Sequence, residues 1–120
     1  MIKIPKDAEK IIEENPVAFA TVNRVSKPNV IAVAFVKVIS RNQVLITDVA
    51  MRQTRNNLKE NNNICLAVWN KNWKGYKLVG KAKYFLVGKW KRFIEEMPEN
   101  KNEKLKGAII VTISKIIRLK

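Results

Sequence analysis

Ten consecutive residues, 30–39, are apolar at every position except Lys37. The run is rich in valine and isoleucine, so we expect an extended strand rather than a helix. Because successive side chains point to opposite faces of a strand, both faces of this one are apolar. A barrel interior can cover only one of them. The other face needs a helix, a ligand or a second copy of the chain, and a homodimer is the simplest solution.

The rest of the chain alternates between strand and helix signals. Five more stretches have strand character, which gives six expected strands; the other five are residues 17–22, 44–47, 64–69, 75–87 and 108–117. Gly80 predicts a bulge or bend within residues 75–87. Short helices are expected over residues 5–14, 51–60 and 89–97. The connections are too short for parallel crossovers, so we predict a mainly β, closed or partly closed barrel with short peripheral helices.

Composition limits the chemistry that the chain can carry out. The 120 residues include 24 Lys and Arg against 10 Asp and Glu, a net charge of +14, and 47% are hydrophobic, which predicts one folded domain over residues 1–120. There is no histidine and one cysteine, Cys65, which excludes Ser/His/Asp triads, Cys/His pairs and ordinary zinc sites within one chain. The sequence shows no signal peptide and no membrane span, so we expect a cytoplasmic protein without a membrane partner.

The positive charge is concentrated with aromatic residues in one stretch. Residues 71–92 hold eight Lys and Arg, five aromatic residues and no acidic residue. A positive surface attracts nucleic acid, anionic membranes or phosphorylated small molecules. One hypothesis is therefore a basic, small-barrel protein that binds single-stranded nucleic acid and stacks bases on Trp73, Tyr76 and Tyr84. Such a lysine run is most commonly a solvated face.

Several short strings lie in a characteristic order along nearly the whole chain. They are PVAFAT at residues 16–21, KVI at 37–39, ITD at 46–48, MRQTRNNL at 51–58, CLAVW at 65–69, WKGY at 73–76 and GKA at 80–82. In order and spacing they resemble the pyridoxamine 5'-phosphate oxidase-like family of FMN-binding split β-barrels, and most closely its short FMN-binding proteins. The resemblance implies a six-stranded split barrel, FMN as cofactor, and a homodimer with the flavin site at the subunit interface.

The resemblance also assigns candidate cofactor-binding residues. The flavin phosphate would lie at the strand-to-helix junction, near Thr47, Asp48, Arg52, Gln53, Thr54 and Asn57. Relatives often carry a lysine where this chain has Gln53 or Thr54, so Arg52 or Arg55 would supply the positive charge. The flavin ring would lie against the second strand, at Val30, Ile31, Ala32, Val33 and Ala34, and would be closed over by Trp73, Lys74, Gly75 and Tyr76. Asp48 also has the character of a turn or helix-cap residue, because a carboxylate repels a phosphate.

These residues favour a flavoprotein that transfers electrons or hydride, with the chemistry supplied by the flavin. The sequence identifies no catalytic acid, base or metal ligand, and it does not name the substrate or redox partner. Pyridoxamine 5'-phosphate oxidase activity itself is not expected, because the true oxidases are longer and use a histidine. A deazaflavin (F420) instead of FMN, and a scaffold of the same fold without a cofactor, remain as alternatives.

Overall fold

The computed structural model describes residues 2–119. Its elements are α1 (Lys6–Glu14), β1 (Val17–Val22), β2 (Pro28–Val33), β3 (Val36–Ser40), β4 (Gln43–Asp48), α2 (Arg52–Glu60), β5 (Asn63–Trp69), β6 (Gly75–Phe85), α3 (Lys89–Glu95), the 3-10 turn η1 (Pro98–Asn100) and β7 (Gly107–Arg118). The predicted mainly β architecture with short helices is confirmed, and the three helices lie where they were expected. None of the helices within residues 2–119 has the length and apolar character that crossing a bilayer requires.

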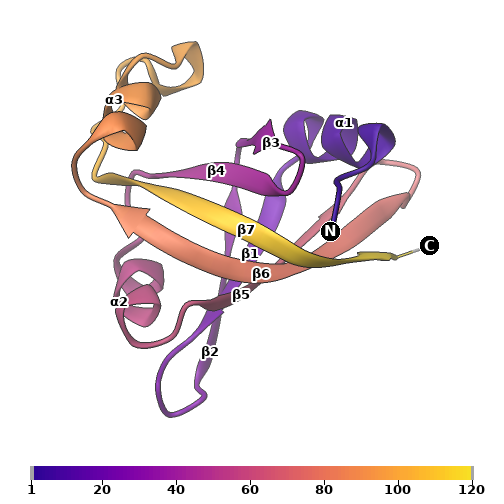
Figure 1. Ribbon diagram of the computed structural model, residues 1–120, viewed down its shortest axis with the longest axis horizontal. Coiled ribbons are helices and arrows are strands. Elements are labelled where there is room, and N and C mark those ends of the chain that lie inside the picture. The colour runs from indigo at the N-terminus through magenta and orange to yellow at the C-terminus, as the bar shows by residue number, and fades with distance from the viewer. Residues whose placement is uncertain (1, 120) are drawn as a thin grey trace.

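The strands form one antiparallel sheet in the order β2-β1-β5-β6-β7-β4-β3. Figure 1 shows this sheet curling on itself, with α1 and α2 at opposite ends of the curled sheet. The two edge strands, β2 and β3, are neighbours in the chain, as a sheet that curls toward closure requires. This arrangement fits a split barrel. The bulge predicted at Gly80 is confirmed, because the pairing of β6 with β7 shifts register between Val79 and Gly80.

The sheet has seven strands, so the prediction of six was wrong. Residues 30–39 do not form one strand, because β2 pairs with β1 whereas β3 pairs with β4. β1 and β4 lie next to opposite edges of the sheet. The chain bends at Ala34 and Phe35 to pass from one edge to the other. The bend also changes which alternate residues face inward: Val33 is buried on one side of it and Val36 on the other.

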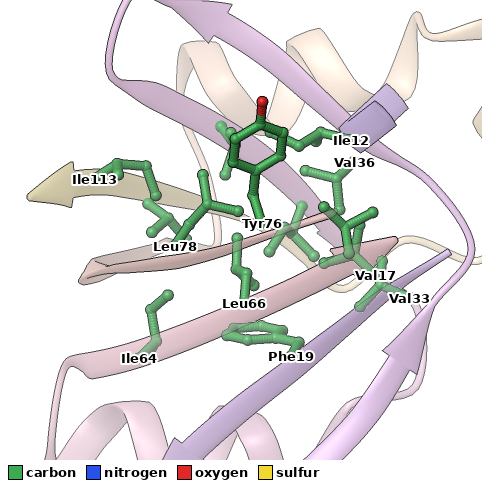
Figure 2. Packing of buried hydrophobic residues seen from close by; sticks show 14 of the residues in the cluster. Ile12, Val17, Phe19, Val33, Val36, Ile64, Leu66, Tyr76, Leu78 and Ile113 are labelled. Atoms are coloured by element: carbon green, nitrogen blue, oxygen red, sulfur yellow. The ribbon is translucent and has the colours of Figure 1, made fainter. Parts of the chain in front are cut away.

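Two hydrophobic clusters hold the fold together. The main one fills the inside of the curled sheet and is closed by Ile11 and Ile12 of α1. Figure 2 shows its side chains pointing toward one another, with Tyr76 beside Ile12 of α1 at one end and Phe19 beside Leu66 at the other. The second cluster lies where Ile94 of α3 packs on β4 and β7. The outward face of β4 and β7 is therefore covered by a helix, whereas that of β2 is not.

Candidate functional site

A cleft of about 490 Å³ lies where β2 ends and the β4–α2 connection begins. Its walls include five predicted residues, namely Ile31, Ala32, Val33, Ala34 and Thr47. Ala32 and Ala34 are exposed, and their small side chains leave this end of the cleft open. The structure thus brings the predicted ring-binding strand next to the predicted phosphate-binding junction.

The far wall of this cleft was missed by sequence reasoning. It is formed by Glu99, Asn100 and Glu103, from the segment predicted only as a charged loop. Asn100 anchors this wall, because its Nδ2 donates hydrogen bonds to Thr47 Oγ1 at 3.1 Å and to the Ile94 carbonyl oxygen at 2.9 Å. No local pattern in the sequence connects residue 100 with residue 47, so only the folded chain reveals this wall.

A second, polar cavity of about 450 Å³ lies at the other end of β2. It is lined by Gln53 and Asn57 of α2, which were predicted, and by residues of the β1–β2 turn and the start of β2, which include Asn23, Lys27 and Asn29. Gln53 Nε2 donates to Asn57 Oδ1 at 2.8 Å, and Asn57 Nδ2 donates to Thr21 Oγ1 at 3.0 Å. The two cavities therefore flank the same strand and the first turns of the same helix.

The N-terminus of α2 lies between the two cavities and has no side-chain cap. The amide N–H groups of its first turn cannot bond within the helix, and they carry the positive end of the helix dipole. Arg52 is exposed and forms no ion pair within residues 2–119. Thr54 is buried, with its Oγ1 accepting a hydrogen bond of 3.4 Å from Asn29 Nδ2. This helix end is suited to an anion.

Asp48 fixes the position of the residues that lead into α2. Its carboxylate is fully buried and accepts hydrogen bonds from the Met51 backbone N–H at 2.8 Å, from Arg55 Nη1 at 2.8 Å and from Tyr84 Oη at 2.5 Å. The hydrogen bond to Asp48 raises the pKa of Arg55. Burial, followed by the bond to Asp48, raises the pKa of Tyr84 to about 12. Asp48 thus closes the turn before α2 and neutralises Arg55, so that of these two arginines Arg52 is available to an anion.

The four remaining predicted residues lie away from both cavities in the folded structure. Trp73, Lys74, Gly75 and Tyr76 form the β5–β6 turn and the start of β6, beside α1, at the opposite side of the molecule from α2 (Figure 1). Tyr76 is buried and donates a hydrogen bond to Asp7 of α1, which is the main reason why the pKa of Asp7 is lowered. Within a single chain, this turn therefore does not reach the two cavities beside α2.

Two features of this turn are unusual. Trp73 is 69% exposed, has a positive φ of 64° and stacks on Trp69 at a centroid distance of 6.2 Å. A Cβ added to Gly75 would lie 2.2 Å from the Val68 carbonyl oxygen, so the close approach of β5 requires glycine there. The tight strand pairing explains the glycine, whereas it does not explain two exposed indole rings.

Comparisons with known proteins identify the family. Residues 4–118 match the family model described as pyridoxamine 5'-phosphate oxidase. An uncharacterized protein of Methanocaldococcus jannaschii is 31% identical over 124 residues, which cover 100% of this chain and 83% of that protein.

Two solved structures share the fold. HupZ of Group A Streptococcus has a TM-score of 0.89 at 20% identity, covering 97% of this chain and 94% of that chain. An FMN-binding protein of Syntrophomonas wolfei has a TM-score of 0.78 at 20% identity, covering 94% of this chain and 84% of that chain.

Proposed function

The chain belongs to the pyridoxamine 5'-phosphate oxidase family, and from this premise we propose that it is a homodimeric protein that binds FMN in the groove along β2. The observation that carries the proposal is the pairing of two cavities around an uncapped helix N-terminus. One cavity is largely apolar and the other is polar, which matches a cofactor that has a flat ring at one end and a phosphate at the other.

The charges along the groove favour one orientation of the cofactor. Lys27 lines the polar cavity, and Arg52 lies at the adjoining helix start, so both attract a phosphate. Glu99 and Glu103 line the apolar cavity and would repel it. We therefore place the phosphate near Arg52 and the ring near Ala32 and Ala34, in agreement with the arrangement that the family resemblance implies.

The bound flavin would supply electron or hydride transfer, and the chain would bind and orient it. Backbone groups of residues 31–34 can hold the polar edge of a ring that lies against the small side chains of Ala32 and Ala34. The carboxylate of Asp48 positions α2 without contacting the cofactor, because its oxygens already accept three hydrogen bonds from within the chain. The chain has no histidine, so a histidine-dependent oxidase mechanism is not part of the proposal.

The homodimer is supported by an apolar face on the outside of the sheet. Val30, 65% exposed, pairs with Ala20, and Ala20 also pairs with Cys65 of β5; the neighbouring row joins Ala32, Ala18 and Ala67. Covering these rows with a second copy removes apolar surface from water. The β5–β6 turn that carries Trp73 lies at the opposite side of the molecule from α2 (Figure 1), so a contact between Trp73 and the flavin would come from the second copy.

The first test is the visible absorption spectrum of the purified protein, followed by identification of the chromophore that heating releases. A yellow protein that releases FMN supports the proposal. Release of F420 would replace the cofactor while keeping the groove. A colourless protein that does not bind added FMN in titration calorimetry would contradict the proposal and favour a scaffold without a cofactor.

The second test asks whether Arg52 binds the phosphate. Arg52→Ala removes one charge-assisted hydrogen bond, so we expect FMN affinity to fall about tenfold to a hundredfold. Affinity for riboflavin, which has no phosphate, is expected to change little. Lys59→Ala is the matched control, because it removes one exposed charge from the last turn of the same helix. Equal losses for FMN and riboflavin would show that Arg52 does not hold the phosphate.

A further inference from the structure

A third groove, of about 270 Å³, lies on the outer face of the sheet between β6, β7 and the start of α3. Its walls include two lysines, two aromatic residues and two amides, namely Lys81, Lys83, Phe85, Trp90, Gln43 and Asn62. It shares no lining residue with the two cavities along β2. It borders the apolar face that the proposed dimer would cover, because Lys81 pairs with Asn63 of β5, one row from Cys65 on the same face.

The charge around this groove is entirely positive in the residues that line it. Lys81 and Lys83 are exposed. They are two residues apart in β6, so they lie on the same face of the strand, about 6.6 Å apart along it. That spacing is close to the distance between successive phosphates of an extended single strand. Neither lysine forms an ion pair within the described part of the chain. Both are therefore available to a polyanion.

The aromatic residues of the groove are already arranged next to cations. The Nζ of Lys83 lies 5.6 Å from the centre of the Phe85 ring, and the Nζ of Lys89 lies 5.0 Å from the centre of the Trp90 ring. Trp90 is only partly buried, so part of its indole faces the groove. Lys89 Nζ lies over a face of that ring, so a base that stacks on this face would replace the ammonium and have it alongside to meet its phosphate.

The two amides add hydrogen-bonding capacity that a purely electrostatic surface lacks. Gln43 is held in position because its Nε2 donates to Thr112 Oγ1 at 3.2 Å. Asn62 is fixed through its backbone carbonyl oxygen, which accepts a bond of 2.9 Å from the Ala82 N–H. Such carboxamides can pair with the edges of unstacked bases.

We propose that this groove, with Lys81, Lys83 and Lys89 around it, binds single-stranded nucleic acid. Cations, a partly exposed indole and amides around one small concavity fit a nucleotide better than the broad surface of an acidic protein. The aromatic platform differs from the one expected from the sequence. The hydroxyl groups of Tyr76 and Tyr84 are bonded to Asp7 and Asp48, and the Tyr76 ring is buried, so these rings do not form the platform.

The test measures fluorescence anisotropy of a labelled oligo(dT) of about 15 nucleotides, a length that covers the usual site size. The double variant Lys81→Glu, Lys83→Glu reverses two charges at the groove. Its matched control is Lys101→Glu, Lys104→Glu, which makes the same change in net charge on an exposed loop elsewhere. We expect the groove variant to bind at least tenfold more weakly than the control at about 0.1 M salt.

The dependence on salt gives a second readout. Loss of two phosphate contacts is expected to lower the slope of log K against log salt by about 1.4 for a single strand. Trp90→Leu keeps an apolar side chain on α3 and is expected to weaken binding about fivefold to a hundredfold by removing the stacking face. The FMN content of the lysine variants should equal that of the wild type, because neither lysine lines the β2 groove.

Three outcomes would overturn the proposal. The first is an absence of binding by the wild type, and the second is an equal loss in the groove variant and its control. The third is competition by poly-L-glutamate at the same charge concentration as oligo(dT), which would indicate an acidic protein as the partner. A melting temperature measured for each variant separates a loss of binding from a loss of folding.

Discussion

Removing the hydroxyl of Tyr84 tests the buried network beneath α2. Tyr84→Phe keeps the ring and deletes one of the three donors to the Asp48 carboxylate. Asp48 is fully buried, so water cannot easily replace the lost donor. A hydrogen bond to a charged group contributes about 1.5–3 kcal/mol, and we expect the free energy of unfolding to fall by about 2 kcal/mol. For a chain of this size, that change lowers the melting temperature by about 6–12 °C.

The dependence on pH makes the prediction more specific. The pKa of Tyr84 is raised from 10.0 to about 12 in the folded protein, so the folded state holds the phenol proton more tightly than the unfolded state does. The stabilisation is therefore complete below pH 10 and is lost as the pH rises through about 12. Because the residue is partly exposed, we expect this pH-dependent part to be about 1–2 kcal/mol after allowing for solvent screening.

The assay is urea unfolding followed by circular dichroism, for the wild type and Tyr84→Phe at several pH values. The difference between them should be constant near neutral pH and shrink between about pH 10 and 12, because the lysines titrate equally in both proteins. Tyr76→Phe is the matched control, since it deletes a hydroxyl whose partner, Asp7, has a side chain that is 40% exposed. A loss at Tyr84 no larger than that at Tyr76, or a difference that does not shrink at high pH, would refute the reasoning.

Two further predictions concern the sheet. Gly80→Ala should lower the free energy of unfolding by about 3 kcal/mol or more, because its Cβ would lie 2.2 Å from the Thr112 carbonyl oxygen, whereas Gly88→Ala, with no atom within 4 Å and a φ of +99°, should cost only about 1–2 kcal/mol of backbone strain. Similar losses in denaturant unfolding would show that the close approach of β6 and β7 is not the cause. Ala32→Glu should convert the proposed dimer to a monomer in light scattering, because it places a charge on the apolar outer face; a wild-type protein that is already monomeric with full flavin content would contradict the dimer.

Much of the fold follows from local patterns in the sequence. The helices expected over residues 5–14, 51–60 and 89–97 are present, and Gly80 marks the bulge, because these signals depend on backbone preferences within a few residues. The family resemblance implies that residues 30–34 and the strand-to-helix junction at residues 47–57 are parts of one site. The structure brings residues 31–34 together with Thr47 and Met51 at one cleft.

The same reasoning could not divide residues 30–39 into two strands. Every residue but Lys37 is apolar, so either alternating set could face inward, and the choice depends on which distant strand pairs with each half. Nor could it find Lys27 or Glu99, which reach the groove from a turn and a charged loop whose sequences resemble any exposed connection.

The sequence by itself determined the strand-rich character, the helix positions, the family and the excess of positive charge. Only the tertiary structure decided how each charge is used. Arg52 and Arg55 are three residues apart on the same helix, yet Arg55 is paired with a buried carboxylate whereas Arg52 is exposed. The physical reason is that the sequence encodes local backbone preference, whereas the environment of a charge is set by residues such as Asp48 and Tyr84 that only the closed sheet brings together.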